Sequence, residues 1–165
     1  YITHFTGDWA LRLLLASLAI TPLRALLNKP SLTQYRRMLG LYAFFYGTLH
    51  LFVWMGLDKQ FFMAELWADI LKRWFITVGM ASLLGMLPLA ITSTTGWIRR
   101  LGFARWQRLH RIVYGCAVLG VLHFYLLVKS DIREPAMYGA ILVLLLGYRV
   151  SAKMGRRTAE TATVR

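Results

Sequence analysis

Three histidines lie in or beside strongly apolar stretches of the sequence, where a polar side chain is costly and usually functional. His50 lies in the apolar segment 38–57 and His123 in the apolar segment 112–128. If both segments are helices that enter from the same side, the rise of ~1.5 Å per residue places His50 about 20 Å and His123 about 18 Å across the membrane. Two imidazoles at similar depth predict bis-histidine ligation of a b-type haem, since each neutral ring supplies one nitrogen to the iron. The alternative is a pair of histidines that only form hydrogen bonds between helices.

His110 lies 13 residues before His123, which puts it about 20 Å nearer the other surface and about 220° around an ideal helix. No other histidine lies at its depth. It is a candidate inner haem ligand with a different sixth ligand, a contact for a flavin or quinone, or a hydrogen-bond partner of a lipid headgroup. Three arginines are candidates for pairing with haem propionates or for contacting a quinone or flavin, although such residues also mark topology: Arg12, Arg37 and Arg111.

Five segments have the length and apolar character that position such histidines in a membrane, where a spanning helix needs about 20 mostly apolar residues. They are residues 9–27, 38–57, 75–91, 112–128 and 136–150. Hydrophobic residues make up 58% of the chain and charged residues 16%, against about 45–50% and about 25% in soluble domains. The sequence therefore predicts an all-α, polytopic membrane bundle that forms a single domain over residues 1–165, and it excludes a soluble or disordered protein. The single cysteine, Cys116, excludes an internal disulfide and a thiolate metal cluster.

Basic residues gather on one side of this predicted bundle. That side comprises the connection between the first two segments, the connection between the third and fourth, and the tail 151–165. Together with Arg24 and Arg149 at the adjoining segment ends, it holds 14 of the 20 Lys and Arg residues and one acid, so the two sides carry +13 and 0. Lys and Arg in short loops mark the cytoplasmic face and attract anionic lipid. We therefore expect a multi-pass protein of the plasma membrane, with a cytoplasmic C-terminus, that contacts the lipid bilayer and not nucleic acid.

The connection 59–73 and the residue after it carry apolar residues at every fourth position, which share one face of a helix. These residues are Phe62, Leu66, Ile70 and Trp74. Charged residues supply the polar surface around this face. We expect an amphipathic interfacial helix over 59–73 on the outer membrane surface, and a plain connector is the alternative.

Several stretches of the sequence resemble the MsrQ family (also called YedZ), a branch of the ferric reductase-like transmembrane domains. They are HFTGDWALRLLLASLAITPLR, RRMLGLYAFFYGTLHL, TSTTGWIRRLG, WQRLHRIVYGCAVLGVLHF and VKSD. The resemblance extends over essentially the whole chain. It implies a haem-binding subunit of a methionine sulfoxide reductase system, located in the bacterial inner membrane.

The resemblance also implies chemistry and partners. Members of this family pass electrons from the quinone pool to MsrP, a periplasmic molybdopterin subunit that repairs oxidised periplasmic proteins, and they are described as binding haem b and FMN. The family's histidines match His50, His110 and His123. A protein of this kind is an electron-transfer subunit, because the hard chemistry belongs to its cofactors and no side chain of its own acts as a catalyst.

The sequence departs from the family pattern in two respects. The family has six spanning helices and five are visible here, so we expect an N-terminal helix to precede Tyr1. Arg37 stands 13 residues before His50, where ferric reductases carry a second histidine, so a complete bis-histidine inner haem is unsupported. No residue identifies an FMN site. The alternative functions are a stand-alone ferric or quinone reductase and a non-redox membrane scaffold.

Overall fold

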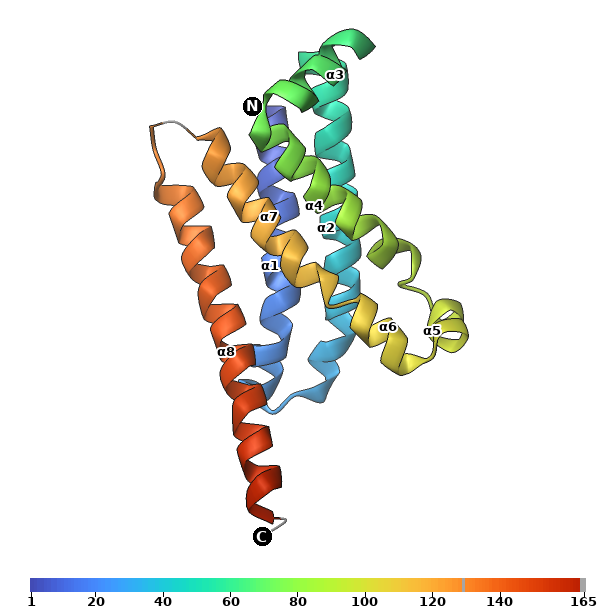
Figure 1. The fold of residues 1–165 in the computed structure, drawn as a ribbon, viewed down its shortest axis with the longest axis vertical. Helices are drawn as coiled ribbons and strands as arrows, with labels where there is room; N and C mark the ends of the chain where they lie inside the picture. The colour runs from blue at the N-terminus through green and yellow to red at the C-terminus, as the bar shows by residue number, and fades with distance from the viewer. Residues whose placement is uncertain (129, 164–165) are drawn as a thin grey trace.

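The chain folds into helices joined by short connections, as a computed structural model shows (Figure 1). The structure describes residues 1–128 and 130–163, the last eight of these by their backbone only. The helices are α1 (Ile2–Leu27), α2 (Thr33–Val53), α3 (Met63–Lys72), α4 (Trp74–Ile91), α5 (Thr95–Leu101), α6 (Phe103–Leu109), α7 (Ile112–Leu127) and α8 (Arg133–Thr163). A 3₁₀ turn, η1 (Pro30–Leu32), precedes α2, and a π-helical turn, η2 (Trp54–Asp58), follows it.

Five helical stretches of the described chain are long and apolar enough to cross a membrane, which confirms the predicted all-α, polytopic bundle. They are Ile2–Leu27, Pro30–Asp58, Trp74–Ile91, Phe103–Leu127 and Arg133–Gly155. Each stretch extends beyond the predicted apolar segment at one end or both, because hydropathy marks only the part of a helix that is apolar; the fourth ends at Leu127, one residue before its predicted end. Helix α8 accordingly continues into the segment 151–165, as far as Thr163.

The long helices alternate in direction, so the two ends of the bundle differ (Figure 1). The upper end in this view holds the N-terminus and α3, and the lower end holds α5 and α6. The most extensive helix contacts are between α1 and α2 and between α4 and α7. Helix α8 packs against both α7 and α1. Two antiparallel helix pairs, α1–α2 and α4–α7, therefore lie side by side, and α8 packs against one helix of each pair.

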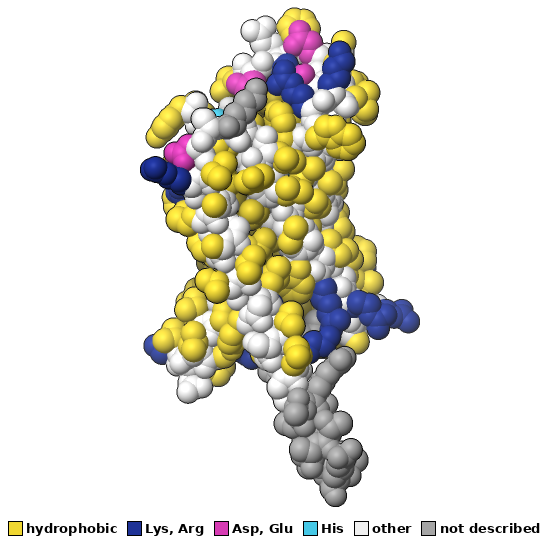
Figure 2. All heavy atoms as spheres, turned by 60° about the vertical axis from the view of Figure 1, so that its left-hand side comes forward, with side chains coloured by type: hydrophobic (Ala, Val, Ile, Leu, Met, Phe, Trp, Pro, Cys, Tyr) yellow, Lys and Arg dark blue, Asp and Glu magenta, His cyan; other side chains and the backbone are white. Residues whose placement is uncertain are grey.

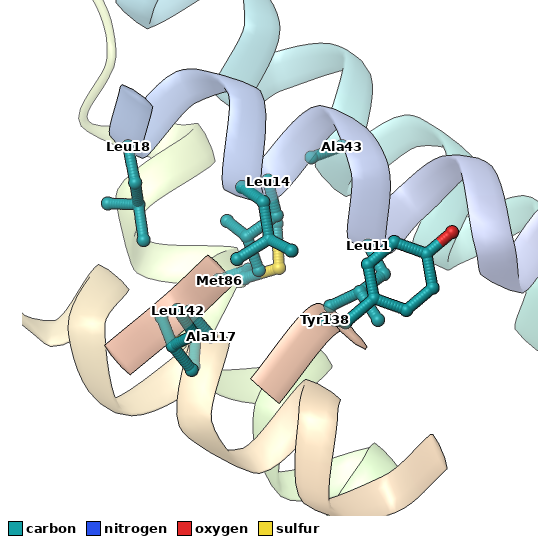
Figure 3. Packing of buried hydrophobic residues seen from close by; sticks show 10 residues of the cluster. Leu11, Leu14, Leu18, Ala43, Met86, Ala117, Tyr138 and Leu142 are labelled. Atoms are coloured by element: carbon teal, nitrogen blue, oxygen red, sulfur yellow. The ribbon is translucent and has the colours of Figure 1, made fainter. Parts of the chain in front are cut away.

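The core lies where α1 meets α4, α7 and α8 (Figure 3). Leu14 and Leu18 of α1 are buried, and Leu18 has no exposed surface. They belong to one cluster with Met86 of α4, Ala117 of α7 and Leu142 of α8. The cluster also holds the small side chains Ala43 and Cys116, and small residues allow helices to approach closely.

A buried polar tie joins α8 to α1 near the lower end. Pro22 has no backbone N–H, so the carbonyl of Leu18, which residue 22 would bond in an uninterrupted helix, lacks that donor. Arg149 of α8 donates one Nη to this carbonyl at 2.7 Å and the other Nη to the hydroxyl of Tyr114 at 2.7 Å. The proline is therefore tolerated because a side chain from another helix replaces the missing donor.

The surface separates an apolar middle from charged ends (Figure 2). On the face shown, Asp and Glu appear only at the upper end, whereas Lys and Arg appear at both ends. This pattern suits a helical bundle that spans a membrane.

The predicted amphipathic segment is a helix, α3, but a shorter one than 59–73. It ends at Lys72 because Arg73 is extended, with φ −114° and ψ 96°. Leu66 is buried, while Trp67 and Leu71 on the opposite side are exposed. Trp74 begins α4 instead of continuing the same helix face.

Candidate functional site

The structure brings together two histidines that are far apart in the sequence. His50 lies in the last turn of α2 and His123 in the last turns of α7. Their ring centroids are 6.2 Å apart, and the ring planes are inclined at 77°. Both helices rise toward the upper end, so the similar depth that the sequence predicts places the two rings next to each other.

A backbone carbonyl holds each of these rings. His50 Nδ1 lies 2.8 Å from the carbonyl oxygen of Thr3 in α1. His123 Nδ1 lies 2.6 Å from the carbonyl oxygen of Phe75 in α4. A carbonyl oxygen can only accept, so each ring carries its proton on Nδ1 and keeps a lone pair on Nε2. A neutral imidazole fixed in this way is the form in which histidine binds a metal.

Both histidines line one cavity of about 450 Å³ between the two helix pairs. Apolar side chains form most of its wall, among them Leu14, Leu83, Met86 and Phe124. Besides the two histidines, five charged or titratable residues line it at the upper end: Tyr1, His4, Asp8, Asp58 and Arg73. A pocket of this volume, apolar with a polar rim, has the usual character of a cofactor site.

The three arginines that sequence reasoning offered as cofactor contacts do not line this cavity. Arg12 donates its Nε to the hydroxyl of Tyr138 at 2.8 Å. Arg37 is exposed near the start of α2, and Arg111 is exposed at the start of α7. The depth of a residue in the membrane, estimated from the sequence, could not show this, because depth does not fix the rotation of a helix about its own axis. Arg73 lines the cavity, but sequence reasoning placed it on the polar face of the predicted interfacial helix 59–73 and not at a cofactor site.

An ion-pair network fixes Arg73 beside the cavity. Asp69 of α3 is 2.6 Å from Lys59 Nζ and 3.2 Å from Arg73 Nε. The hydrogen bond from Lys59 lowers the pKa of the Asp69 carboxyl, the positive charge of Arg73 lowers it further, and burial opposes this shift. The carboxylate therefore stays ionised and holds the end of α3 against the start of α4.

His110 has a different environment from the other two histidines. It ends α6 at the break before α7, so it does not lie on one continuous helix with His123. Its Nε2 is 3.0 Å from the hydroxyl oxygen of Thr92, which itself donates to the carbonyl of Pro88 at 2.7 Å. The hydroxyl can therefore only accept from His110, so the Nε2 of this ring carries a proton.

An aromatic side chain also packs on His110. The ring of Trp106 lies 4.0 Å away between centroids, and its Nε1 donates to the carbonyl of Thr92 at 2.9 Å. His110 is not part of the lining of the histidine cavity. The structure thus assigns it to a hydrogen-bonded cluster at the lower end, where α4 ends.

Comparison with known proteins gives concordant results. The family described as "Ferric reductase like transmembrane component" matches residues 6–134. A protein of Xanthomonas axonopodis pv. citri (strain 306) is 56% identical over 164 residues, which cover 98% of this chain and 75% of that protein. One of Caulobacter vibrioides (strain ATCC 19089 / CIP 103742 / CB 15) is 52% identical over 157 residues, or 95% of this chain and 74% of that protein. Both are named "Protein-methionine-sulfoxide reductase heme-binding subunit MsrQ". No solved structure matches the chain.

Proposed function

Because the chain belongs to the MsrQ family and carries its ferric reductase-like transmembrane component, we propose that it is a haem b electron-transfer subunit of a methionine sulfoxide reductase system. The observation that carries this proposal is the pair His50 and His123. Both rings line one apolar cavity, and each has its Nδ1 bonded to a carbonyl and its Nε2 available to a metal.

The distance between the two rings fits an iron with two axial histidines. Metal–imidazole bonds are about 2.0–2.1 Å long. Two such bonds, with about 1 Å from each nitrogen to its ring centre, give a centroid separation of roughly 6 Å. The observed separation is 6.2 Å. Little movement of either helix is therefore needed for both histidines to bind one iron.

The bound haem would supply one-electron transfer, while the chain binds it, orients it and limits its contact with water. His50 and His123 would hold the iron, the apolar wall would receive the macrocycle, and the two helix carbonyls keep the Nδ1 protons in place. These residues perform no acid–base or nucleophilic step. Electron transfer requires only that the ligand geometry persist in both oxidation states.

The proposed direction of electron flow rests on the charge distribution. Lys and Arg dominate the connections at the lower end, which the positive-inside rule assigns to the cytoplasm. The histidine cavity, near the upper end, would then lie toward the periplasm. We infer that electrons enter from the quinone pool and leave to a periplasmic molybdopterin subunit, MsrP, in the bacterial inner membrane. The quinone, FMN and MsrP come from the family resemblance, and no set of described side chains assigns a place to FMN.

The reduced-minus-oxidised visible spectrum of the purified protein tests the haem proposal. We expect a six-coordinate b-type spectrum that His50→Ala and His123→Ala abolish. His110→Ala is the control, since this histidine does not line the cavity. A wild type that stays colourless after haem-supplemented expression, or variants that keep the wild-type spectrum, would contradict the proposal.

A second experiment tests the partners. Purified protein in lipid vesicles is mixed with a reduced quinol, and haem reduction is followed in the visible spectrum. An MsrP-type molybdopterin subunit with methionine sulfoxide should then reoxidise the haem. Reoxidation by ferric citrate but not by the molybdopterin subunit would instead identify a stand-alone ferric reductase.

A further inference from the structure

Helix α4 places two groups next to the ring of His123: the carbonyl of Phe75 and, four residues later, Gly79. The carbonyl of Phe75 lies 2.6 Å from Nδ1 of the imidazole, and Gly79 follows one turn later in α4. Cα–Cβ bonds in a helix tilt toward its N-terminus, so a Cβ at residue 79 would lean over this carbonyl. Such a Cβ would lie 2.7 Å from Nδ1 and 2.9 Å from Cε1 of His123. The ring would then have to move away from its acceptor.

The helix beside His50 has the same arrangement. The carbonyl of Thr3 lies 2.8 Å from its Nδ1, and Gly7 follows four residues later in α1. A Cβ at residue 7 would lie 3.1 Å from both Nδ1 and Cε1 of His50. The acceptor precedes its histidine by 47 residues in this pair and by 48 in the other. The pairs α1–α2 and α4–α7 thus hold their histidines in the same way.

We propose that Gly7 and Gly79 are positioning residues for the haem ligands. By lacking a Cβ, each lets an imidazole reach the helix carbonyl, which fixes the proton on Nδ1 and leaves Nε2 for the iron. This inference rests on the proposed haem site. A ligand histidine that donates its other N–H to a carbonyl is a stronger electron donor to the metal. The two glycines therefore act on both the affinity for haem and its reduction potential.

The test is to replace each glycine by alanine in the full chain and to measure haem affinity and reduction potential. For Gly79→Ala we expect about 10–100-fold weaker haem binding, the usual cost of losing a partner of a ligand histidine. The haem that remains should have a higher potential, because a weaker donor stabilises ferric iron less. Gly7→Ala should change both quantities in the same direction but less, since its Cβ contact is 3.1 Å instead of 2.7 Å.

Two further glycines serve as matched controls. A Cβ at Gly85, also in α4, would lie 2.8 Å from Sγ of Cys116 in α7, so Gly85→Ala strains the same helix interface without touching a histidine. A Cβ at Gly115 in α7 would meet nothing within 4 Å. We expect both variants to keep the wild-type haem affinity and potential, although Gly85→Ala lowers thermal stability.

The outcomes separate the two proposals. If Gly79→Ala matches Gly115→Ala in affinity and potential, or if Gly85→Ala changes them as much as Gly79→Ala, the positioning role is wrong while the haem site stands. A wild type that binds no haem overturns the haem site and this inference with it.

Discussion

The two ends of the bundle use histidine in opposite ways. At the upper end, the rings of His50 and His123 donate Nδ1 to backbone carbonyls and leave Nε2 free in an apolar cavity. At the lower end, Nε2 of His110 is bonded to Thr92, and Trp106 covers the ring. Histidine therefore provides candidate metal ligands at the upper end, whereas at the lower end it forms a hydrogen bond to Thr92, where α4 ends.

Depth in the membrane is therefore not sufficient to identify a ligand. A buried polar group is costly unless it has a partner, so the informative question is which atom the structure leaves unpartnered. At the lower end, both Nη groups of Arg149 and Nε2 of His110 bond to groups of the protein itself, and Nε of Arg149 is buried without a hydrogen-bond partner among the described residues. At the upper end, two acceptor nitrogens share one cavity, and a metal is the partner that suits both.

The largest expected effect is a contrast between the histidines. His50→Ala should abolish the six-coordinate haem, because one axial ligand is lost. His110→Ala and Thr92→Val should each retain it, because neither residue lines the cavity. The measurement is haem per protein together with the low-spin ferric EPR signal. With ring planes 77° apart, this signal should be strongly anisotropic, since nearly perpendicular axial rings leave two iron d orbitals close in energy.

Two results would break this contrast. Loss of the low-spin signal in His110→Ala would show that haem binding depends on His110, although this residue lies outside the cavity. A second low-spin signal in the wild type that only His110→Ala removes would establish the inner haem site that the family resemblance suggests.

The next effect concerns the lower end, where polar groups stabilise the fold. Arg149→Leu should destabilise the bundle by about 2 kcal/mol, because it leaves the buried carbonyl of Leu18 without a donor. Pro22→Ala restores a backbone N–H that can bond this carbonyl. The arginine substitution should therefore cost about 1 kcal/mol less in the Pro22→Ala background. Thermal unfolding in detergent measures the stability of the wild type, of the two single variants and of the double variant.

The haem spectrum should remain unchanged in all four proteins, because Arg149 and Pro22 lie outside the histidine cavity. Equal costs of Arg149→Leu with and without Pro22 would show that the arginine does not replace the missing N–H. Arg149→Lys is a useful comparison, since it keeps the charge but cannot reach both Leu18 and Tyr114 through a planar fork.

Hydropathy and helical rise predicted the five spanning segments and the similar depth of His50 and His123, but not the short helices α5 and α6. Both predicted features are properties of the chain along the helix axis, where each residue advances by a fixed distance. Rotation about the axis was not predictable in this way. Arg12 is the example, since it lies near the depth of the histidines but donates to Tyr138 outside the cavity.

The backbone carbonyls that hold the two histidine rings could not be predicted from the sequence either. Thr3 and Phe75 act through their carbonyls, so their side chains carry no signal. The sequence shows no internal repeat, although the acceptor-to-histidine separations of 47 and 48 residues are nearly equal. The sequence does contain one signal of these supports. Gly7 stands 43 residues before His50, and Gly79 stands 44 residues before His123.

The smallest expected effect is a pH dependence of the thermal stability that arises at the upper end of the bundle. The ion pairs that fix the upper end contain a carboxylate, Asp69, whereas the ties through Arg149 and His110 contain none. Because the folded state lowers the pKa of Asp69, its contribution to stability is complete above the unfolded value of about 3.9. The contribution is lost as the pH falls through the folded pKa. Asp69→Asn should therefore lower the Tm by about 2–4 °C above pH 5, for a cost of about 1 kcal/mol. The gap to the wild type should close as the solution is acidified below pH 4.

Glu65→Gln is the control, because its carboxylate is exposed and lies 3.7 Å from Lys59, and it should leave the Tm unchanged. A gap between Asp69→Asn and the wild type that stays constant from pH 6 to pH 3 would mean that the carboxylate stabilises the upper end through packing and not through its charge.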